Sequence, residues 1–333
     1  MTTQGPRSLL FLSCDIVGST RFKQQQGNLW QKTFLSFYRE FPQMLGELTR
    51  EAAYTPGFTL WKPVGDELIF TSEVRSEKDV YAAVRIWLNA MQSYEENVLN
   101  DVSLATKGGA FIATFPGPDS ESSIPRDPLT ETSDKGVVEL NDEALASRSP
   151  EYLFDYFGPS IDTGFRVLSA CSQRYFTLSV EVAWAMAQCD ADAGVNTTDF
   201  PLEDLLLLET REFKGVWDGR EYPLFALDRH HLDLVNVALA RIRNQKLAAW
   251  DVVNLCKECS AKANWPSKLF LPDSEHLQFK AQPVDSLAAL RSNSMEGAET
   301  VPVASGGESL RADAPLGGGT PPPTPLPSSP ESP

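Results

Sequence analysis

The stretch that decides the fold of this chain is Leu9-Leu10-Phe11-Leu12-Ser13-Cys14-Asp15-Ile16-Val17-Gly18-Ser19-Thr20. A short apolar run closed by an acid predicts a buried strand whose carboxylate lies at the rim of a sheet. The Gly-Ser-Thr that follows predicts a helix start, where the first backbone N–H groups have no partner inside the helix. An acid beside free amides suits a metal-bound triphosphate, because the acid holds the cation and the amides hold phosphate oxygens. A buried strand followed by a capped helix is also common without any such function.

A second stretch, Leu60-Trp61-Lys62-Pro63-Val64-Gly65-Asp66-Glu67-Leu68-Ile69-Phe70, predicts a hairpin. Two short apolar runs flank the turn residues Gly65 and Asp66. The turn would put Asp66 at a sheet edge, where it can lie beside Asp15. Two carboxylates in one site repel each other unless a cation lies between them, and the hard divalent ions that accompany nucleotides take such oxygen ligands. Taken alone, Asp66 is equally well explained as an ordinary turn aspartate.

These two stretches resemble the class III nucleotidyl cyclases, and two later segments agree in the family's order. One is Phe154-Asp155-Tyr156-Phe157-Gly158-Pro159-Ser160-Ile161-Asp162-Thr163-Gly164-Phe165-Arg166, similar to the family's Asp-x-x-Gly-x-x-Val-Asn-x-Ala-x-Arg segment. The other is Phe213-Lys214-Gly215-Val216 with Tyr222-Pro223-Leu224-Phe225, which looks like the strand pair that closes the family's domain. The resemblance therefore covers roughly residues 8–228.

Strands interleaved with helices along the chain indicate an α/β or an α+β layered domain, and of these the resemblance implies α+β. The resemblance implies a ferredoxin-like βαββαβ cyclase domain over 8–228. Residues 116–150 are rich in Pro, Ser, Asp and Glu, so we expect a long, partly mobile surface insertion there, either a tolerated loop or a lid. A helical extension over 229–284 and a disordered Pro/Gly/Ser-rich tail over 285–333 complete the predicted organisation.

The resemblance also implies roles for site residues. Two divalent metal ions, Mn²⁺ or Mg²⁺, would be held by Asp15, Asp66 and the main-chain carbonyl of Ile16. Arg166 would stabilise the pentacovalent phosphorus, for which a planar, permanently charged guanidinium is suited. Asp162 stands where the family usually has an Asn that orients the ribose. A carboxylate accepts hydrogen bonds but does not donate them, so this departure leaves the ribose role open.

Lys62 and Asp155 stand where adenylate cyclases of the family read the base. A donor paired with an acceptor matches the hydrogen-bonding groups of adenine and also those of uracil. Guanine presents an acceptor and a donor in the same order as uracil but needs a larger pocket. The stretches Val17-Gly-Ser-Thr-Arg-Phe-Lys23 and Phe37-Tyr38-Arg39-Glu40-Phe41-Pro42 are similar to the uridylate cyclases of bacterial Pycsar antiphage systems. The resemblance thus favours a cytoplasmic uridylate cyclase that acts on a ribonucleoside triphosphate as a homodimer, with its sites at the interface.

Composition excludes several other function classes. The chain has 333 residues, a hydrophobic fraction of 42% and a formal net charge of −16. With no basic block, a partnership with nucleic acid or with an acidic membrane surface is disfavoured. No apolar run is long enough for a membrane span, and residues 1–7 lack a signal-peptide core. Five scattered cysteines are typical of a reducing compartment, and Cys256 with Cys259 is more simply two helix-face residues than a zinc or redox site.

Three alternatives stay open at this point. The chain could be an ordinary adenylate cyclase, or a degenerate cyclase domain that senses nucleotide without catalysis, which the Asp162 departure favours. A GGDEF-type cyclic-dinucleotide synthase would share the core fold, but Gly108-Gly109 is followed by Ala110 and Phe111 rather than by an acid.

Overall fold

The computed structural model describes residues 5–25, 27, 29–129, 131, 134–193, 199–243 and 247–295. Its strands are β1 (Arg7–Val17), β2 (Thr59–Val64), β3 (Glu67–Val74), β4 (Ala105–Lys107), β5 (Gly109–Phe115), β6 (Ser120–Pro125), β7 (Tyr152–Phe157), β8 (Tyr175–Leu178), β9 (Leu205–Glu212) and β10 (Glu221–Asp228). Its α-helices are α1 (Ser19–Gln25), α2 (Leu29–Glu51), α3 (Glu77–Tyr94), α4 (Val137–Ser147), α5 (Pro159–Ser169), α6 (Val180–Ala193), α7 (Leu234–Ile242), α8 (Ala249–Ser260) and α9 (Ala288–Met295).

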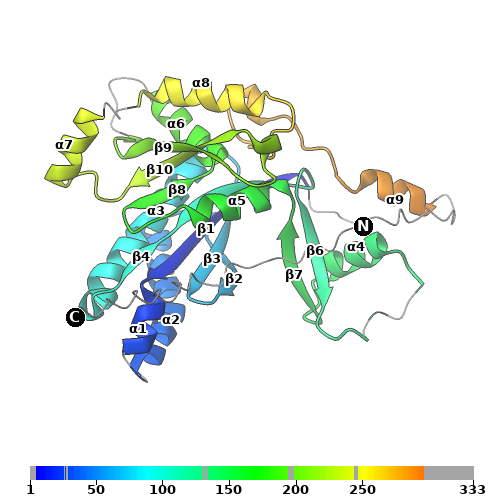
Figure 1. The fold of residues 1–333 in the computed structure, drawn as a ribbon. Coiled ribbons are helices and arrows are strands. Elements are labelled where there is room, and N and C mark those ends of the chain that lie inside the picture. The colour runs from blue at the N-terminus through cyan, green and yellow to red at the C-terminus, as the bar shows by residue number, and fades with distance from the viewer. Residues whose placement is uncertain are drawn as a thin grey trace, which may run out of the picture. The chain divides into compact units, whose positions relative to one another are not determined.

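The large sheet has the strand order β2-β3-β1-β5-β8-β10-β9, and β4 also pairs with β1 (Figure 1). β1, β2, β3 and β5 are antiparallel to their neighbours in the order β5-β1-β3-β2. With α1 and α2 after β1, and α3 after β3, this is the ferredoxin-like βαββαβ arrangement. The α+β prediction is confirmed. β8 joins this half of the sheet parallel to β5, and the hairpin of β9 and β10 closes it.

β1 is the central strand, paired with β3 on one side and with β5 and β4 on the other. Because successive side chains of a strand point to opposite faces, β1 supplies both cores of the domain. Leu10 and Leu12 belong to the larger core, while Leu9 and Phe11 belong to a smaller one on the other face. The strand runs two residues past the predicted end at Asp15, since the ladder with β4 continues to Val17.

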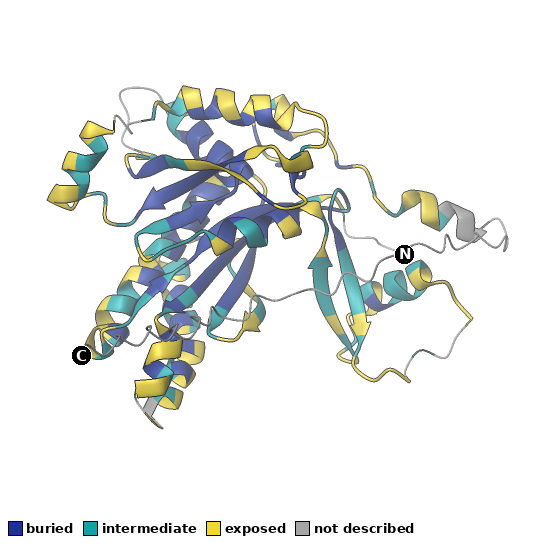
Figure 2. Ribbon diagram, viewed as in Figure 1, coloured by how far each residue is buried: buried dark blue, intermediate teal, exposed yellow. Residues whose placement is uncertain are grey.

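Helices cover the two faces of the sheet unequally. Side chains from α2, α3, α6 and α8 fill the larger core with the strands, and Figure 2 shows the central strands as buried. On the other face, α5 packs over an aromatic cluster that includes Phe11, Phe111 and Phe115. Each fully buried side chain of this kind contributes about 1.5–3 kcal/mol. The face that carries α5 is less completely covered, and it is the face on which Asp15 lies.

α2 continues through Pro42 and Gly46, two residues that disfavour an unbroken helix. A proline inside a helix costs about 3 kcal/mol through its missing N–H and its ring clash. Phe37, Phe41 and Leu45 of this helix are fully or nearly fully buried, and the two phenylalanine rings pack against Trp87 and Tyr94 of α3. Burial of these side chains offsets the cost, so the helix persists across the proline.

The insertion over 116–150 is more ordered than the sequence predicted. It contributes β6 and α4, and β6 pairs antiparallel with β7 in a separate two-stranded sheet. β7 carries Asp155, so residues of the insertion and a predicted site residue share one ladder, in which Ser122 pairs with Asp155. We call β6, β7 and α4 the arm. Both interpretations of the insertion, a tolerated loop and a lid, remain predictions.

The C-terminal part begins with α7 and α8, in the region predicted to be helical. α8 packs on α6, while every side chain of α7 is exposed or only partly buried (Figure 2). Near the start of the predicted tail, Ala288–Met295 form α9. Arg291 of α9 bonds Asp142 of the arm at 2.6 Å and also contacts Asp285, which holds the helix in place. The remainder of the predicted tail lies outside the described residues.

Candidate active site

Acidic and basic side chains meet on the less covered face, at the end of β1. Asp15 pairs in register with Glu67 of β3 and with Lys107 of β4. Asp66 is the turn residue directly before β3. The structure therefore brings Asp15 and Asp66 together, as the hairpin prediction required. We call Asp15, Asp66 and Glu67 the acid cluster.

Two lysines accompany the acid cluster. The Nζ atom of Lys107 lies 3.1 Å from Asp15 Oδ2, and that of Lys23 lies 3.7 Å from Asp66 Oδ1. Burial raises the pKa of Asp15; Lys107 opposes this shift and the neighbouring Asp66 carboxyl adds to it. Burial, and next the charge of Asp15, raise the pKa of Glu67, while the neighbouring Ser13 hydroxyl lowers it. The carboxylates crowd one another, and the lysines offset only part of their charge.

Backbone geometry positions these groups. Gly65 has φ +63°, the left-handed conformation that a tight hairpin turn requires, and the hydroxyl of Tyr38 in α2 donates to its carbonyl. Between β4 and β5, a Cβ on Gly108 would lie 1.9 Å from the carbonyl oxygen of Ser13. Only glycine allows this close approach of two backbones, and the approach brings Lys107 onto Asp15.

A second group lies where β2 meets the arm. Lys62 Nζ lies 3.0 Å from Asp155 Oδ1, and the indole N–H of Trp61 donates to the same oxygen at 2.9 Å. The Lys62 ammonium also lies 4.0 Å from the centre of the Trp61 ring, a cation–π contact. Both charged side chains are about one-third exposed, at 33% and 34%. The two residues expected to read a base are thus in contact with each other.

α5 supplies Asp162 and Arg166, one helical turn apart. Asp162 is exposed in the first turn, and Arg166 donates from Nε to the carbonyl of Lys214 at 2.9 Å instead of pairing with Asp162. A Cβ on Gly164 would lie 2.3 Å from the Phe111 ring, so the helix is packed directly on the sheet. Lys214 and Gly215, singled out in the sequence, meet the active-site face through this bond.

The N-terminus of α5 is held by a buried carboxylate that the sequence did not single out. Asp119 is fully buried, and it accepts from the backbone N–H of Ser160 at 2.9 Å and of Thr114 at 3.2 Å. Gly158, at φ +142°, leaves space for it, since a Cβ there would lie 2.5 Å from Asp119 Oδ1. Asp119 thereby joins the end of β5 to the helix of Asp162 and Arg166.

The site residues form two separate groups in one chain. Asp15 and Asp66 lie with Lys107 and Lys23, whereas Lys62 lies with Asp155. Within the part of the chain that the structure describes, no hydrogen bond or ion pair links the first group to Lys62, Asp155 or Arg166.

The acid cluster fits a divalent cation shared with a phosphate group. Among the described residues, no set of three or more His, Cys, Asp and Glu side chains is arranged to enclose a metal by itself. Two carboxylates with a raised Asp15 pKa are nevertheless a hard-oxygen donor pair that a cation would stabilise in its ionised form. The side chain of Ile16 is buried in the larger core, so its main-chain carbonyl is the group it could offer.

Sequence reasoning missed Lys23 and Lys107 as site residues, as well as Trp61 and Asp119. Lys107 directly precedes the Gly108-Gly109 pair, and Trp61 adjoins Lys62. These neighbours were the available signals. Asp119 had none, because its burial depends on how the arm meets α5.

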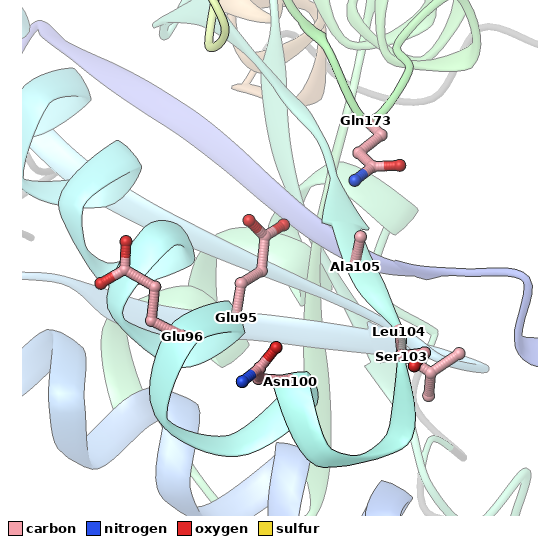
Figure 3. A pocket seen from close by; sticks show the side chains of 7 residues that line it. All are labelled: Glu95, Glu96, Asn100, Ser103, Leu104, Ala105 and Gln173. Carbon is pink, nitrogen blue, oxygen red and sulfur yellow. The ribbon is translucent and has the colours of Figure 1, made fainter.

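A separate acidic hollow of about 380 Å³ lies beside the start of β4, where Glu95, Ala105 and Gln173 are among the residues that line it (Figure 3). Its Glu95 accepts from the N–H and hydroxyl of Thr106, both at 2.6 Å, and from Arg229 at 2.8 Å. Glu96 accepts from Gln92. These bonds satisfy the carboxylates within the fold, so we do not assign the chemistry to this hollow.

No protein-family model and no curated protein matches the chain. Among solved structures it is similar to the adenylyl cyclase CyaB from P. aeruginosa, with 13% identity, a TM-score of 0.45, and coverage of 68% of this chain and 96% of that one. It is also similar to the guanylate cyclase domain of RhGC from Catenaria anguillulae in complex with GTP (10%, 0.42, 67% and 97%). A third is the adenylate/guanylate cyclase/hydrolase from Silicibacter pomeroyi (15%, 0.38, 67% and 97%). Such distant similarity does not assign an activity, so the function below rests on the side chains of the site.

A membrane-crossing helix would need a long apolar stretch. None of the helices in the described ranges meets that requirement.

Proposed function

We propose that this protein is a nucleotidyl cyclase that converts a ribonucleoside triphosphate to its 3′,5′-cyclic monophosphate and pyrophosphate. The observation that carries the proposal is the pairing of Asp15 with Asp66 on the less covered face of the sheet. A like-charged pair of this kind has no structural advantage by itself, since the two carboxylates repel. It suits a site that binds a cation together with a triphosphate.

The reaction forms one P–O bond and breaks another. The ribose 3′-oxygen attacks the α-phosphorus, the bond from that phosphorus to the bridging oxygen breaks, and the hydroxyl proton passes to solvent as pyrophosphate leaves. Divalent cations, when bound, would lower the pKa of the 3′-hydroxyl and offset charge on the triphosphate. Asp15, Asp66 and the carbonyl of Ile16 would hold them. Mn²⁺ and Mg²⁺ both suit this oxygen set.

Arg166 and Asp162 would act on the other side of the substrate. The Nε of Arg166 is bound to the Lys214 carbonyl, and its terminal nitrogens can donate to the phosphorus oxygens as charge develops. Asp162 is exposed in the first turn of the same helix. It can accept a hydrogen bond from a ribose hydroxyl.

The complete site would form between two copies of the chain. Among the residues that the structure describes, no hydrogen bond or ion pair joins Lys62, Asp155 or Arg166 to the acid cluster within one chain. A homodimer would let the acids of one copy face the base-reading pair of the other and so create two sites. Separation of the two groups supports this arrangement.

UTP is the substrate that we favour. Lys62 offers a donor to O4 of uracil and Asp155 an acceptor to N3–H, and the resemblance to the uridylate cyclases of Pycsar antiphage systems points the same way. The cyclic UMP product would then be a second messenger in antiphage defence. Adenine offers N1 and its N6 amine to the same pair, so an adenylate cyclase is the closest alternative.

A nucleotide-sensing module without catalysis is the second candidate. Asp162, at the position where the family has an Asn, and the lysines bound to the acids favour it. Such a module would bind the triphosphate and release it unchanged.

The deciding experiment incubates the full-length protein with Mn²⁺ and each of the four ribonucleoside triphosphates, with products identified by mass. We expect cyclic UMP from the wild type and none from Asp15→Asn or Asp66→Asn, both judged folded by circular dichroism. Detection of cyclic AMP would instead support the adenylate cyclase alternative. Nucleotide binding without any cyclic product would support the nucleotide-sensing module.

A further inference from the structure

Two lysines lie on the carboxylates that our proposed function assigns to cations. Lys107 is bound to Asp15 and Lys23 to Asp66, at 3.1 and 3.7 Å. A cation on those oxygens would repel an ammonium at such distances. The lysines therefore have to move when the cations bind, and the structure shows what makes that movement easy.

Each lysine is held weakly and has room to turn. Their side chains are 37% and 35% exposed, and ion pairs as exposed as these contribute little to stability. The lysine stem is flexible and its ammonium is a compact point charge. Lys23 additionally lies 4.4 Å from the centre of the Phe34 ring, which keeps its stem close to the acid cluster after the ion pair opens.

The displaced ammonium groups have a nearby alternative partner in the ligand itself. A nucleoside triphosphate brings several anionic oxygens to the cations, and lysine is a common phosphate ligand. Three carboxylates face two lysines here, so the cluster is net negative before any cation arrives.

We propose that Lys107 and Lys23 exchange partners: they neutralise Asp15 and Asp66 in the free protein and bind triphosphate oxygens once cations and nucleotide arrive together. This inference rests on the proposed function, since it needs cations at the acid cluster. It has a thermodynamic consequence. Cations that bind alone must displace the lysines while no triphosphate oxygen is present to bind the displaced ammonium groups. Nucleotide and cation therefore bind cooperatively, and each raises the affinity of the protein for the other by the same factor.

The test measures that coupling rather than turnover. Mn²⁺ binding to the full-length protein is titrated alone and again with saturating 3′-deoxyuridine triphosphate or 3′-deoxyadenosine triphosphate, which lack the attacking hydroxyl. The variants are K107Q, K23Q and the double substitution. Lys78, exposed on α3 and on the opposite face of the sheet, supplies the matched control K78Q.

Opposite signs are expected for the two measurements. Removing each lysine should tighten Mn²⁺ alone by about two- to fivefold and weaken the nucleotide by about tenfold. K107R, which keeps the charge, should restore most of the nucleotide affinity. K78Q should match the wild type in both titrations.

Several results would overturn the exchange. If the glutamine variants bind Mn²⁺ and nucleotide as the wild type does, or lose affinity for both, the lysines do not exchange, whatever the activity. If the wild type binds no Mn²⁺, or if D15N leaves Mn²⁺ binding unchanged, the cation site of the proposed function fails and the exchange fails with it. If the coupling between Mn²⁺ and nucleotide binding is as strong in the double variant as in the wild type, the exchange is rejected but the proposed function is not.

Discussion

The ammonium nitrogen of Lys62 lies 3.0 Å from Oδ1 and 3.2 Å from Oδ2 of Asp155 within one chain. These atoms come from β2 of the large sheet and β7 of the arm. The proposed function assigns this donor and this acceptor to a base, and their contact places them side by side. Trp61 adds an indole N–H on the same carboxylate, which fixes its orientation.

The first prediction concerns base choice. In Asp155→Asn an amide replaces the acceptor and its bond from Lys62 weakens. We expect kcat/KM for the favoured triphosphate to fall about 10²-fold, with a much smaller fall for the others, because a polar group left unpaired discriminates strongly. Steady-state kinetics on all four triphosphates measures it.

Trp61→Phe is the control for that variant, since it removes one N–H donor and keeps an aromatic ring against Phe11. It should lower kcat/KM by only about three- to tenfold, the value of one hydrogen bond. An equal loss for all four triphosphates in Asp155→Asn would show that Asp155 supports the fold rather than reading the base.

The second prediction concerns the homodimer. Asp66→Asn and Arg166→Gln should each be inactive alone. Mixed and allowed to exchange subunits, they should regain about a quarter of wild-type activity, because half of the dimers are mixed and each of these has one intact site. Activity assays of the mixture against each parent test this. An unrestored mixture, with exchange verified by mass, would place the complete site within one chain.

The third prediction compares two helical glycines. Gly164→Ala should destabilise the protein by about 1–3 kcal/mol, since the new Cβ would lie 2.3 Å from the Phe111 ring. Gly46→Ala in α2 has nothing within 4 Å and should instead stabilise by about 0.5–1 kcal/mol through helix propensity. Urea denaturation of both gives the free energies of unfolding. The same sign for both would mean that α5 does not pack as described.

The fourth prediction concerns Asp119. Burial raises its pKa to about 6, against hydrogen bonds from Ser160 and Thr114 that lower it. The folded state therefore binds the proton more tightly than the unfolded chain, and this group's contribution to stability is full below about pH 4 and lost as the pH rises to 6. The total is about 3 kcal/mol.

Asp119→Asn removes that titration. Between pH 5 and pH 7 the free energy of unfolding of the wild type should fall by about 1–2 kcal/mol relative to the variant. Urea denaturation at several pH values compares the two proteins directly. Parallel curves across this range would mean that the carboxyl is ionised throughout.

Short-range sequence signals predicted most of the fold. The apolar run before Asp15 and the Gly65-Asp66 turn both form the predicted elements. Each depends on neighbours in sequence, through alternation or turn geometry. Long-range packing decides other elements: α2 crosses Pro42 because Phe37 and Phe41 are buried, and β6 of the insertion forms because β7 pairs with it.

The sequence by itself determined the strand that carries Asp15, the hairpin that carries Lys62 and Asp66, and the helix that carries Asp162 and Arg166. Periodicity and turn chemistry depend on residues close together in the chain, so they can be recognised from the amino-acid sequence alone. Only the tertiary structure decided which of these groups meet: Lys107 on Asp15, Lys23 on Asp66, Trp61 and Lys62 on Asp155, and Asp119 under α5. Such contacts join residues far apart in the chain, and their pairing follows from sheet register and burial, which no local pattern records.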